Sequence, residues 1–381
     1  MELVKPGIYI NFMRHSRVLM GLSLAIVAVS IVLIFFPGLN YGLDFTGGTE
    51  IQLGFKGKVT AKELRSALKD MGYDRPEVFS VQDRPNEYII RVVEISSLSN
   101  NRIKQVRQNL HAALPGVAVK EFKLSPGRDK ISLRLSGAVE PSALIEAVQR
   151  AGIKVRSAAA FGASADNRYE VRLTGLADEM VKQLQGRFKA RAPDAPRRVE
   201  WVGPKAGAQL RTAALQSMLY AIAFIMVYVA FRFDLRFAPG GVLAMIHDAV
   251  VTLGIFAVLR KEVNLSTVAA VLTVMGYSVN DTIVIFDRVR ENMQRMRDKS
   301  LGELINISMS QTLSRTIITS LTVGLSMAAF FYWGTPVIRD FAFAMMVGLF
   351  LGTWSTIYIA MPFTEWMDRR FFRASDARSR K

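Results

Sequence analysis

Hydrophobic residues are distributed along the chain as one isolated apolar stretch near the N-terminus and five more beyond residue 211. A helix needs about 20 mostly apolar residues to cross the ~30 Å hydrocarbon core of a bilayer. Six stretches meet this requirement, and we expect a membrane-spanning helix in each: Val18–Phe36, Thr212–Phe231, Ala238–Leu259, Val263–Phe286, Gln311–Trp333 and Phe341–Phe363. The pattern predicts a polytopic membrane protein, with helices two to six within 212–366.

The first apolar stretch has two interpretations. Arg14 and Arg17 precede it, as basic residues precede the core of a signal peptide. However, the stretch is longer than the ~7–15 apolar residues of such a core, and no small-x-small cleavage site follows it. We therefore expect an uncleaved anchor over 18–36.

Positive charge is distributed unevenly between the loops. The chain carries 49 Lys and Arg against 32 Asp and Glu, a net charge of +17. If the N-terminus is cytoplasmic, Lys and Arg concentrate in the loops and tails on that side, while the short opposite loops hold only Arg260, Lys261 and Arg339. This bias predicts a cytoplasmic N-terminal segment 1–17, a basic cytoplasmic tail 367–381 and an exterior domain over 37–211. Because the basic excess is explained by topology, we expect no nucleic-acid partner.

Several classes of chemistry lack their sequence signals. The chain has no cysteine, and its three histidines are too scattered to indicate a zinc site. No G-x-x-x-x-G-K-[ST] phosphate loop is present. We therefore expect no metal, no cofactor and no enzyme activity.

The segment 37–211 contains an internal similarity at an offset of eighty residues. The alternating strand that begins at Glu50 matches the one at Lys130, and Gly72 and Gly152 both stand where a helix ends. Thr60 with Glu63 predicts a capping box at the start of the first helix. The succession of strands and helices predicts two tandem ferredoxin-like βαββαβ units, 50–125 and 130–203, so the fold class is a six-helix membrane bundle with an α+β exterior domain.

Each unit is expected to continue beyond its first strand and helix in the same order. A further strand, a third strand, a second helix and a last strand follow in both units. In the first unit they are Glu77–Gln82, Tyr88–Val93, Asn100–Ala113 and Val117–Lys123, and in the second Val155–Phe161, Tyr169–Leu173, Ala177–Ala190 and Arg197–Val202.

Polar residues interrupt the predicted spans at three places. An ionisable group inside a membrane helix costs several kcal/mol unless it is paired or hydrated, so it is a functional candidate by default. The third span carries His247-Asp248, the fourth carries Asn280-Asp281, and the fifth carries Arg315 in its first turn. A buried Asp281 facing Arg315 would satisfy both charges. The alternatives are that Arg315 reaches the headgroups and that the pair is only a structural tie between helices.

The motifs of the chain, taken together, resemble those of the SecF family, the smaller half of the SecD–SecF complex of bacterial protein export. Six motifs carry the resemblance in order along the chain: Gly42-Leu43-Asp44-Phe45-Thr46-Gly47-Gly48, Glu200-Trp201-Val202-Gly203-Pro204, His247-Asp248, Gly276-Tyr277-Ser278-Val279-Asn280-Asp281-Thr282, Asp287-Arg288-Val289-Arg290-Glu291-Asn292 and Gln311-Thr312-Leu313-Ser314-Arg315-Thr316. One motif would be weak, whereas six on a matching topology are specific.

The resemblance implies a bundle like half of a resistance–nodulation–division transporter in the bacterial inner membrane. It also implies SecD as a partner, the SecYEG translocon as client, YajC as an additional candidate partner and unfolded preprotein as substrate. Asp281 and Arg315 fall on the family residues associated with proton movement, and Asp248 and Asn280 join them as candidates. Asp44, Gly47, Gly48 and Gly276 fall on structural motif positions. Family members commonly carry one small exterior domain, whereas two copies are predicted here.

We therefore expect a subunit that uses the proton gradient to promote the late outward movement of preproteins, with protons as the coupling ion. The alternative from the same superfamily is a subunit of a proton-driven efflux transporter, which would be expected to have a second large exterior domain and a repeated six-helix half. A third possibility is a purely structural assembly subunit, which would tolerate loss of Asp281.

Overall fold

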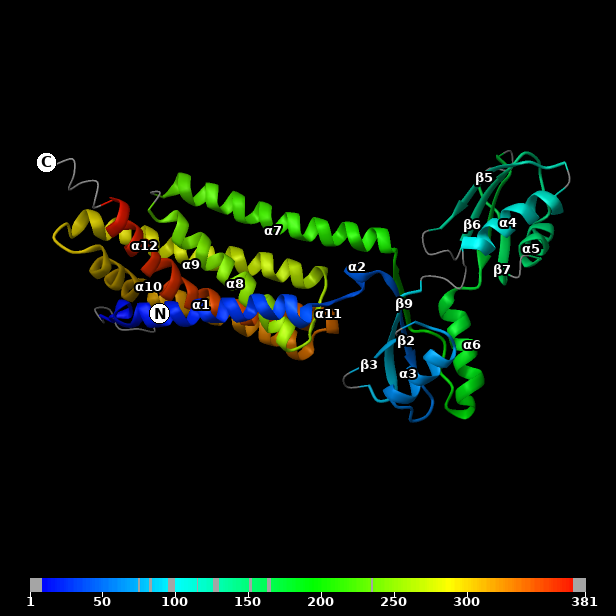
Figure 1. Cartoon of the computed structure of the whole chain (residues 1–381), viewed down its shortest axis with the longest axis horizontal. Helices are drawn as coiled ribbons and strands as arrows, with labels where there is room; N and C mark the ends of the chain where they lie inside the picture. The colour runs from blue at the N-terminus through cyan, green and yellow to red at the C-terminus, as the bar shows by residue number, and fades with distance from the viewer. Residues whose placement is uncertain are drawn as a thin grey trace. The chain divides into compact units, whose positions relative to one another are not determined.

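The computed structural model of the chain describes residues 9–372 apart from 75, 82–83, 95–99, 115, 126–129, 151–152, 163–165 and 234–235 (Figure 1). The chain divides into two compact units. The first, called here the helical unit, consists of Met1–Gly42 and Arg211–Lys381, and the second, called the inter-helix domain, is Leu43–Leu210. Parts of the predicted segments 1–17 and 367–381, and the predicted helix end at Gly152, lie outside the described residues.

Six helices in the described part of the chain are long and apolar enough to cross a membrane, which confirms the six predicted spans. They are α1 (Ser16–Leu33), α7 (Pro204–Arg232), α8 (Ala238–Val258), α9 (Leu265–Arg295), α10 (Leu301–Trp333) and α11 (Pro336–Ser355). The last span continues without a break through η5 (Thr356–Ala360), α12 (Met361–Met367) and η6 (Asp368–Phe372).

Several spans are longer than the apolar pattern predicted: α7 begins at Pro204 rather than at Thr212, and the last span covers 336–372 rather than 341–363. α9 runs beyond Phe286 to Arg295, and α10 begins at Leu301 rather than at Gln311. A capping box explains the earlier start of α10, because the Ser300 hydroxyl accepts from the Glu303 N–H and the Glu303 carboxylate accepts from the Ser300 N–H. Hydropathy missed the extensions of α9 and α10 because each contains charged residues, such as Arg290 and Glu303.

The six helices differ sharply in how much of their surface the helical unit itself covers. In the most apolar window, 61% of α8, 56% of α9 and 50% of the α11 span are buried, against 11% of α1 and 6% each of α7 and α10. The core cluster accordingly joins residues such as Met245, Met275 and Phe286. α8, α9 and α11 form the centre, and the other three helices leave broad apolar faces for lipid or another membrane protein.

Short elements complete the helical unit. The 3-10 helix η1 (Phe12–His15) precedes α1, and the wide turn η2 (Ile34–Gly38) follows it. β1 (Asn40–Tyr41) then pairs in parallel with β10 (Glu262–Val263). This pairing fixes the exit of α1 to the connection between α8 and α9.

The inter-helix domain contains two four-stranded antiparallel sheets. The first has the order β3-β4-β2-β9 and the second the order β5-β6-β8-β7. Their strands are β2 (Gly48–Gly54), β3 (Glu77–Ser80), β4 (Glu87–Val92), β9 (Arg198–Val202), β5 (Val119–Leu124), β6 (Lys130–Leu135), β7 (Val155–Ala160) and β8 (Arg168–Leu173). The helices are α2 (Leu43–Thr46), α3 (Ala61–Asp70), α4 (Asn100–Ala113), α5 (Pro141–Gln149), α6 (Leu176–Phe188) and the short η4 (Lys189–Arg191).

The two predicted units exchange their last helix and last strand, so the prediction that 50–125 and 130–203 each fold by themselves is wrong. β9, from the second unit, pairs with β2, and β5, from the first unit, pairs with β6. The helices follow the same exchange, because Met180 and Leu184 of α6 lie in the core of the first sheet and Val106 and Leu110 of α4 lie in the core of the second (Figure 1).

The short connection between β5 and β6 accounts for the exchange. The Ser125 N–H donates to the Lys130 carbonyl at 2.8 Å, closing a hairpin between neighbouring strands. Such a hairpin brings β5 to β6 at a much lower loop-closure cost than a return to β2. Each sheet still has the strand order of a βαββαβ unit, fourth-first-third-second, so the similarity in the sequence is real while its spatial partners are exchanged.

Candidate functional site

Asp281 lies on the buried side of α9, at the centre of the helical unit. Its side chain belongs to the buried set at 8% exposure, between Ser278 and Ile285 on the same helix face. Asn280, the neighbouring candidate, points away from the helical unit and is exposed. The structure therefore separates these two residues, which the sequence had placed together.

Arg315 lies on the neighbouring helix α10, which packs beside α9. Its positive charge interacts electrostatically with the Asp281 carboxylate. Within the described residues, however, neither a hydrogen bond nor an ion pair joins the two side chains. Arg315 is exposed whereas the next residue, Thr316, is buried. The direct contact between Asp281 and Arg315, one of the arrangements that the sequence left open, is therefore not formed within the described residues, and the Arg315 side chain is exposed instead.

A cluster of polar side chains joins α9 and α10 next to this pair. Gln311, one turn before Arg315, accepts at Oε1 from Arg288 Nε at 2.6 Å and from Asn292 Nδ2 at 2.9 Å. Asn292 Nδ2 also donates to Ser308 Oγ at 2.9 Å. Arg288, Asn292 and Gln311 were part of the quoted motifs, whereas Ser308 was not, and the contacts among them were not predicted from the sequence. They fix the register of the two helices that carry Asp281 and Arg315.

Asp248 lies in a separate polar cluster, in the buried face of α8. Its side chain is fully buried, with His247 Nδ1 2.9 Å from Oδ1 and the Ser355 hydroxyl donating to Oδ2 at 2.8 Å. Sequence reasoning found the His247-Asp248 pair as an intramembrane acid. It did not find Ser355, because a serine in an apolar helix carries no signal by itself.

The predicted glycines have two different roles. Gly47 and Gly48 have φ values of +69° and +126°, and a Cβ on Gly48 would lie 2.4 Å from the Val92 carbonyl oxygen. Only glycine fits this turn, which starts β2 directly after α2, the helix that contains Asp44. Gly276 is different, because it is exposed on α9 and no atom lies within 4 Å of its added Cβ.

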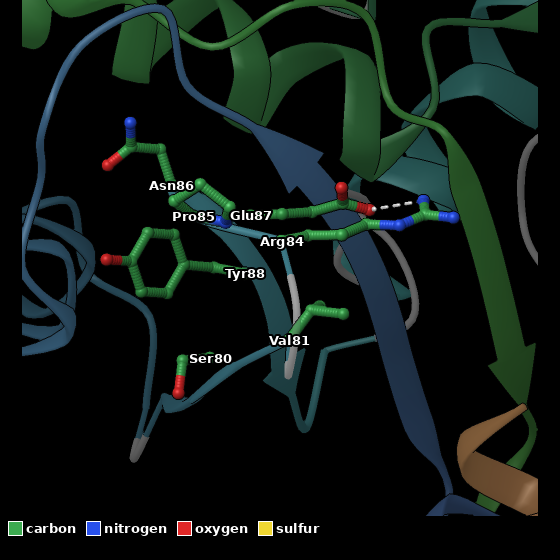
Figure 2. A pocket seen from close by; sticks show the side chains of 7 residues that line it. All are labelled: Ser80, Val81, Arg84, Pro85, Asn86, Glu87 and Tyr88. Atoms are coloured by element: carbon green, nitrogen blue, oxygen red, sulfur yellow. Dashed lines mark hydrogen bonds and ion pairs between the residues drawn. The ribbon is translucent and has the colours of Figure 1, made fainter. Parts of the chain in front are cut away.

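A pocket of about 420 Å³ lies in the inter-helix domain, beside the turn between β3 and β4. Figure 2 shows its lining residues, including the ion pair between Arg84 and Glu87. It contains none of the predicted site residues. Among the residues that the structure describes, no group of three or more His, Cys, Asp and Glu side chains is placed to hold a metal ion.

Comparison with known protein families supports the interpretation of the sequence motifs. The family model described as "Protein export membrane protein SecD/SecF, C-terminal" matches residues 184–370, and the "SecD/SecF GG Motif" model matches residues 32–59. The second match contains Gly47 and Gly48 and also Asp44. The first contains Asp248, Asp281 and Arg315.

Individual relatives match nearly the whole chain. The chain is 33% identical over 359 residues to the protein translocase subunit SecF of Vibrio alginolyticus, covering 94% of this chain and 90% of that one. It is 34% identical over 370 residues to the SecF subunit of Magnetococcus marinus, covering 97% and 95%.

A solved structure shares both the fold and the sequence. The crystal structure of SecDF from Thermus thermophilus, a translocon-associated membrane protein, superposes with a TM-score of 0.64 at 29% identity. The match covers 97% of this chain and 40% of the SecDF chain. From the extent and identity of these matches, the chain belongs to the SecF family of protein translocase subunits.

Proposed function

We propose that this chain is the SecF-like subunit of a bacterial export machine, and that it uses the proton gradient to promote late, outward movement of preproteins through SecYEG. The observation that carries the proposal is a buried carboxyl group, Asp281, on a helix packed beside the one that carries Arg315, in a multi-span SecF-family bundle. An acid in such a position is costly unless it is used, so intramembrane acids are functional candidates.

The coupling step rests on the electrostatic attraction between Asp281 and Arg315. The ionised carboxylate attracts the guanidinium, and proton uptake removes that attraction. No hydrogen bond or ion pair joins the two side chains within the described residues, so a change in the charge of Asp281 would alter the attraction between α9 and α10 without first breaking a direct bond. Protonation from the exterior and release toward the cytoplasm would then drive one helix movement per cycle.

The proposed partner is a SecD-like membrane subunit. α7 and α10 are only 6% buried within the helical unit, so each offers an apolar face to a neighbour. The matched Thermus thermophilus chain is named SecDF and is much longer than this one, because the match covers only 40% of its length. A separate SecD-like chain would provide the remainder here, with SecYEG as client, YajC as a further partner and the lipid bilayer around the assembly.

The proposed orientation places both termini in the cytoplasm and the inter-helix domain outside the cytoplasmic membrane. The charge bias of the short loops supports it. Because the native chain has no cysteine, single cysteines can test it. A cysteine at Ala160 should react with an impermeant thiol reagent from outside, and one at Lys299 only after the membrane is opened; the reverse pattern would overturn the orientation.

The inter-helix domain is proposed to hold extended polypeptide by strand addition at the free edge of β7. The other sheet edges carry protective charges, such as Glu121 and Lys123 on β5 and Arg198 and Glu200 on β9. β7 carries one charge, Arg156, but its last three residues are alanines, and its pairing with β8 leaves the backbone groups of Ala158 and Ala160 directed away from the sheet. An added strand would satisfy these groups.

The direct test is preprotein movement in membrane vesicles with and without an imposed proton gradient. Asp281→Asn should abolish the response to the gradient while membrane insertion and partner assembly continue, because the substitution keeps the size and removes the titrating group. Asp287→Asn is the matched control, since that exposed residue lies on the same helix with only a 3.8 Å ion pair to Arg232. Full gradient response in Asp281→Asn vesicles would refute proton coupling at this residue.

A further inference from the structure

Asp248 is a fully buried acid that the proposed coupling step does not use. Its side chain is 0% exposed, deeper than Asp281, and its two oxygens are occupied by His247 Nδ1 and Ser355 Oγ. Among the described residues, its ion-pair partner is this histidine alone, on the same helix. A lone buried charge is costly, so hydrogen bonding must account for its presence.

The bond to Ser355 lies at the point where the last span changes its geometry. α11 ends at Ser355, and the next five residues, Thr356–Ala360, form a π turn that is wider than an α-helical turn. Ser355 Oγ also donates to the Gly352 carbonyl at 3.1 Å. Such π turns inside helices occur frequently at functional sites. Asp248 therefore holds Ser355, the residue directly before this turn, from a different helix.

From the turn, the hydrogen bonding continues to α9. Thr356 Oγ1 lies 2.9 Å from Thr282 Oγ1, and Thr282 Oγ1 donates to the Ser278 carbonyl at 3.0 Å. Thr282 and Thr356 are 2% and 1% exposed, so neither hydroxyl has water as an alternative partner. Thr282 directly follows Asp281 in α9. A seam of buried polar contacts thus runs from Asp248 through the turn to the residue next to the coupling acid.

The helices along this seam are closely packed, with little space between their backbones and side chains. A Cβ on Gly352 would lie 3.3 Å from Ser278 Cβ and 3.7 Å from Asp248 Oδ2, and one on Gly348 would lie 2.1 Å from Val274 Cγ2. The backbone of α11 is therefore in direct contact with side chains of α9 and close to Asp248. In a closely packed interior, a displacement at one side is passed to the other.

We infer that Asp248 is a positioning residue for Asp281: through Ser355, Thr356 and Thr282 it holds the α9 turn on which the coupling acid stands. The inference rests on the proposed function of Asp281. It requires hydrogen bonding by residue 248 and does not require a charge. Asparagine, with one acceptor oxygen and one NH₂ group of the same size, should therefore replace Asp248, whereas leucine should not.

The experiment uses the full chain in membrane vesicles with its partners and two readouts. The first is gradient-dependent preprotein movement. The second is the rate at which a hydrophobic carbodiimide modifies the Asp281 carboxyl, followed by mass spectrometry of the peptide and with Asp281→Asn as the blank. The second readout reports on the surroundings of Asp281 even if the proposed function is wrong, so failure of the function and failure of the inference can be distinguished.

Asp248→Asn should keep at least half of the gradient-dependent movement and modify Asp281 at a rate within about twofold of the native chain. Asp248→Leu and the nearly isosteric Thr356→Val should each change the modification rate at least threefold and reduce movement at least fivefold, at unchanged protein level. If Asp248→Leu does not accumulate, Thr356→Val decides the question. A native modification rate in Thr356→Val, or loss of movement in Asp248→Asn equal to that in Asp281→Asn, would overturn the inference.

Discussion

The exchanged topology of the inter-helix domain can be tested by a disulfide, since the native chain offers no competing thiols. Gln52 of β2 lies opposite Arg198 of β9. Directly opposed residues in an antiparallel pair have Cα atoms about 4.5–5.5 Å apart, within the range that a disulfide accepts. The pair Gln52→Cys/Arg198→Cys should therefore cross-link on mild oxidation.

The stabilisation expected from this disulfide follows from the length of the chain segment that it closes into a loop. The segment from 52 to 198 is about as long as a small domain, and closing a loop of that size removes about 5 kcal/mol of chain entropy from the unfolded state, as an upper value. Losing the Gln52 side-chain bond to Glu87 offsets about 1 kcal/mol of this. Oxidation should raise the unfolding midpoint of the domain, and reduction should reverse the change.

The matched control is Ser132→Cys/Arg198→Cys. Ser132 occupies the position of Gln52 at the eighty-residue offset, and it would face Arg198 if the two units were contiguous. In the structure Ser132 pairs with Lys123 and Glu170 instead. Non-reducing electrophoresis with thiol counting checks both pairs. A cross-link in the Ser132 pair and none in the Gln52 pair would refute the exchange.

Three further predictions concern the inter-helix domain. Gly48→Ala should destabilise the domain by about 1–3 kcal/mol, because φ is +126° and the new Cβ meets the Val92 carbonyl. Gly72→Ala, with φ +91° and no neighbouring atom, should cost only the backbone strain. Resistance of the two variants to protease measures the difference. Burial, and then the negative charges of Glu179 and Glu94, raise the pKa of Tyr73 to about 12. The domain should therefore lose stability as the pH rises above about 10, the pKa of an unfolded tyrosine. Glu179→Gln should lower the pKa of Tyr73, as measured by ultraviolet absorbance titration. Ala160→Pro should weaken cross-linking of an extended preprotein to β7 severalfold while Ala160→Val does not, because only proline removes the outward N–H; equal effects would argue against strand addition.

Local signals predicted the elements of this chain well. The six spans depend on runs of about 20 apolar residues, a length that few other structures require. The capping box of Thr60 and Glu63 was predicted from adjacent residues and is present, with the Glu63 N–H donating to Thr60 Oγ1. Pro141 likewise stands in the first turn of α5, a position that favours proline for reasons local to the sequence. Each of these signals involves residues close in sequence, so a single segment contains all the residues that determine the element.

Which strand pairs with which, and which side chains contact one another, could not be predicted in the same way. Similarity between two repeats shows that β5 and β9 are equivalent, but either strand can satisfy either sheet with the same residues. The partner of Asp248 posed the same problem, because Ser355 is far along the chain and has no charge to reveal it. Arg315 was expected in the first turn of its helix, but α10 begins at Leu301, so Arg315 lies about four turns into the helix. Its exposure, next to the buried Thr316, depends on how α10 packs. These features are decided by tertiary packing, which periodicity does not report.

The burial of the helices suggests why the coupling pair is left open in the isolated chain. Asp281 belongs to the well-covered centre, whereas Arg315 belongs to a helix that is only 6% buried in its apolar window. A guanidinium on such a surface would face lipid, which is costly, or a second membrane subunit. Cover over α10 would remove Arg315 from its present exposed position and strengthen its attraction to Asp281, because charges interact more strongly away from water. Under the proposed function, a partner that covers α10 would complete the arrangement of Asp281 and Arg315, and export would be expected to respond to the gradient only in the assembled complex.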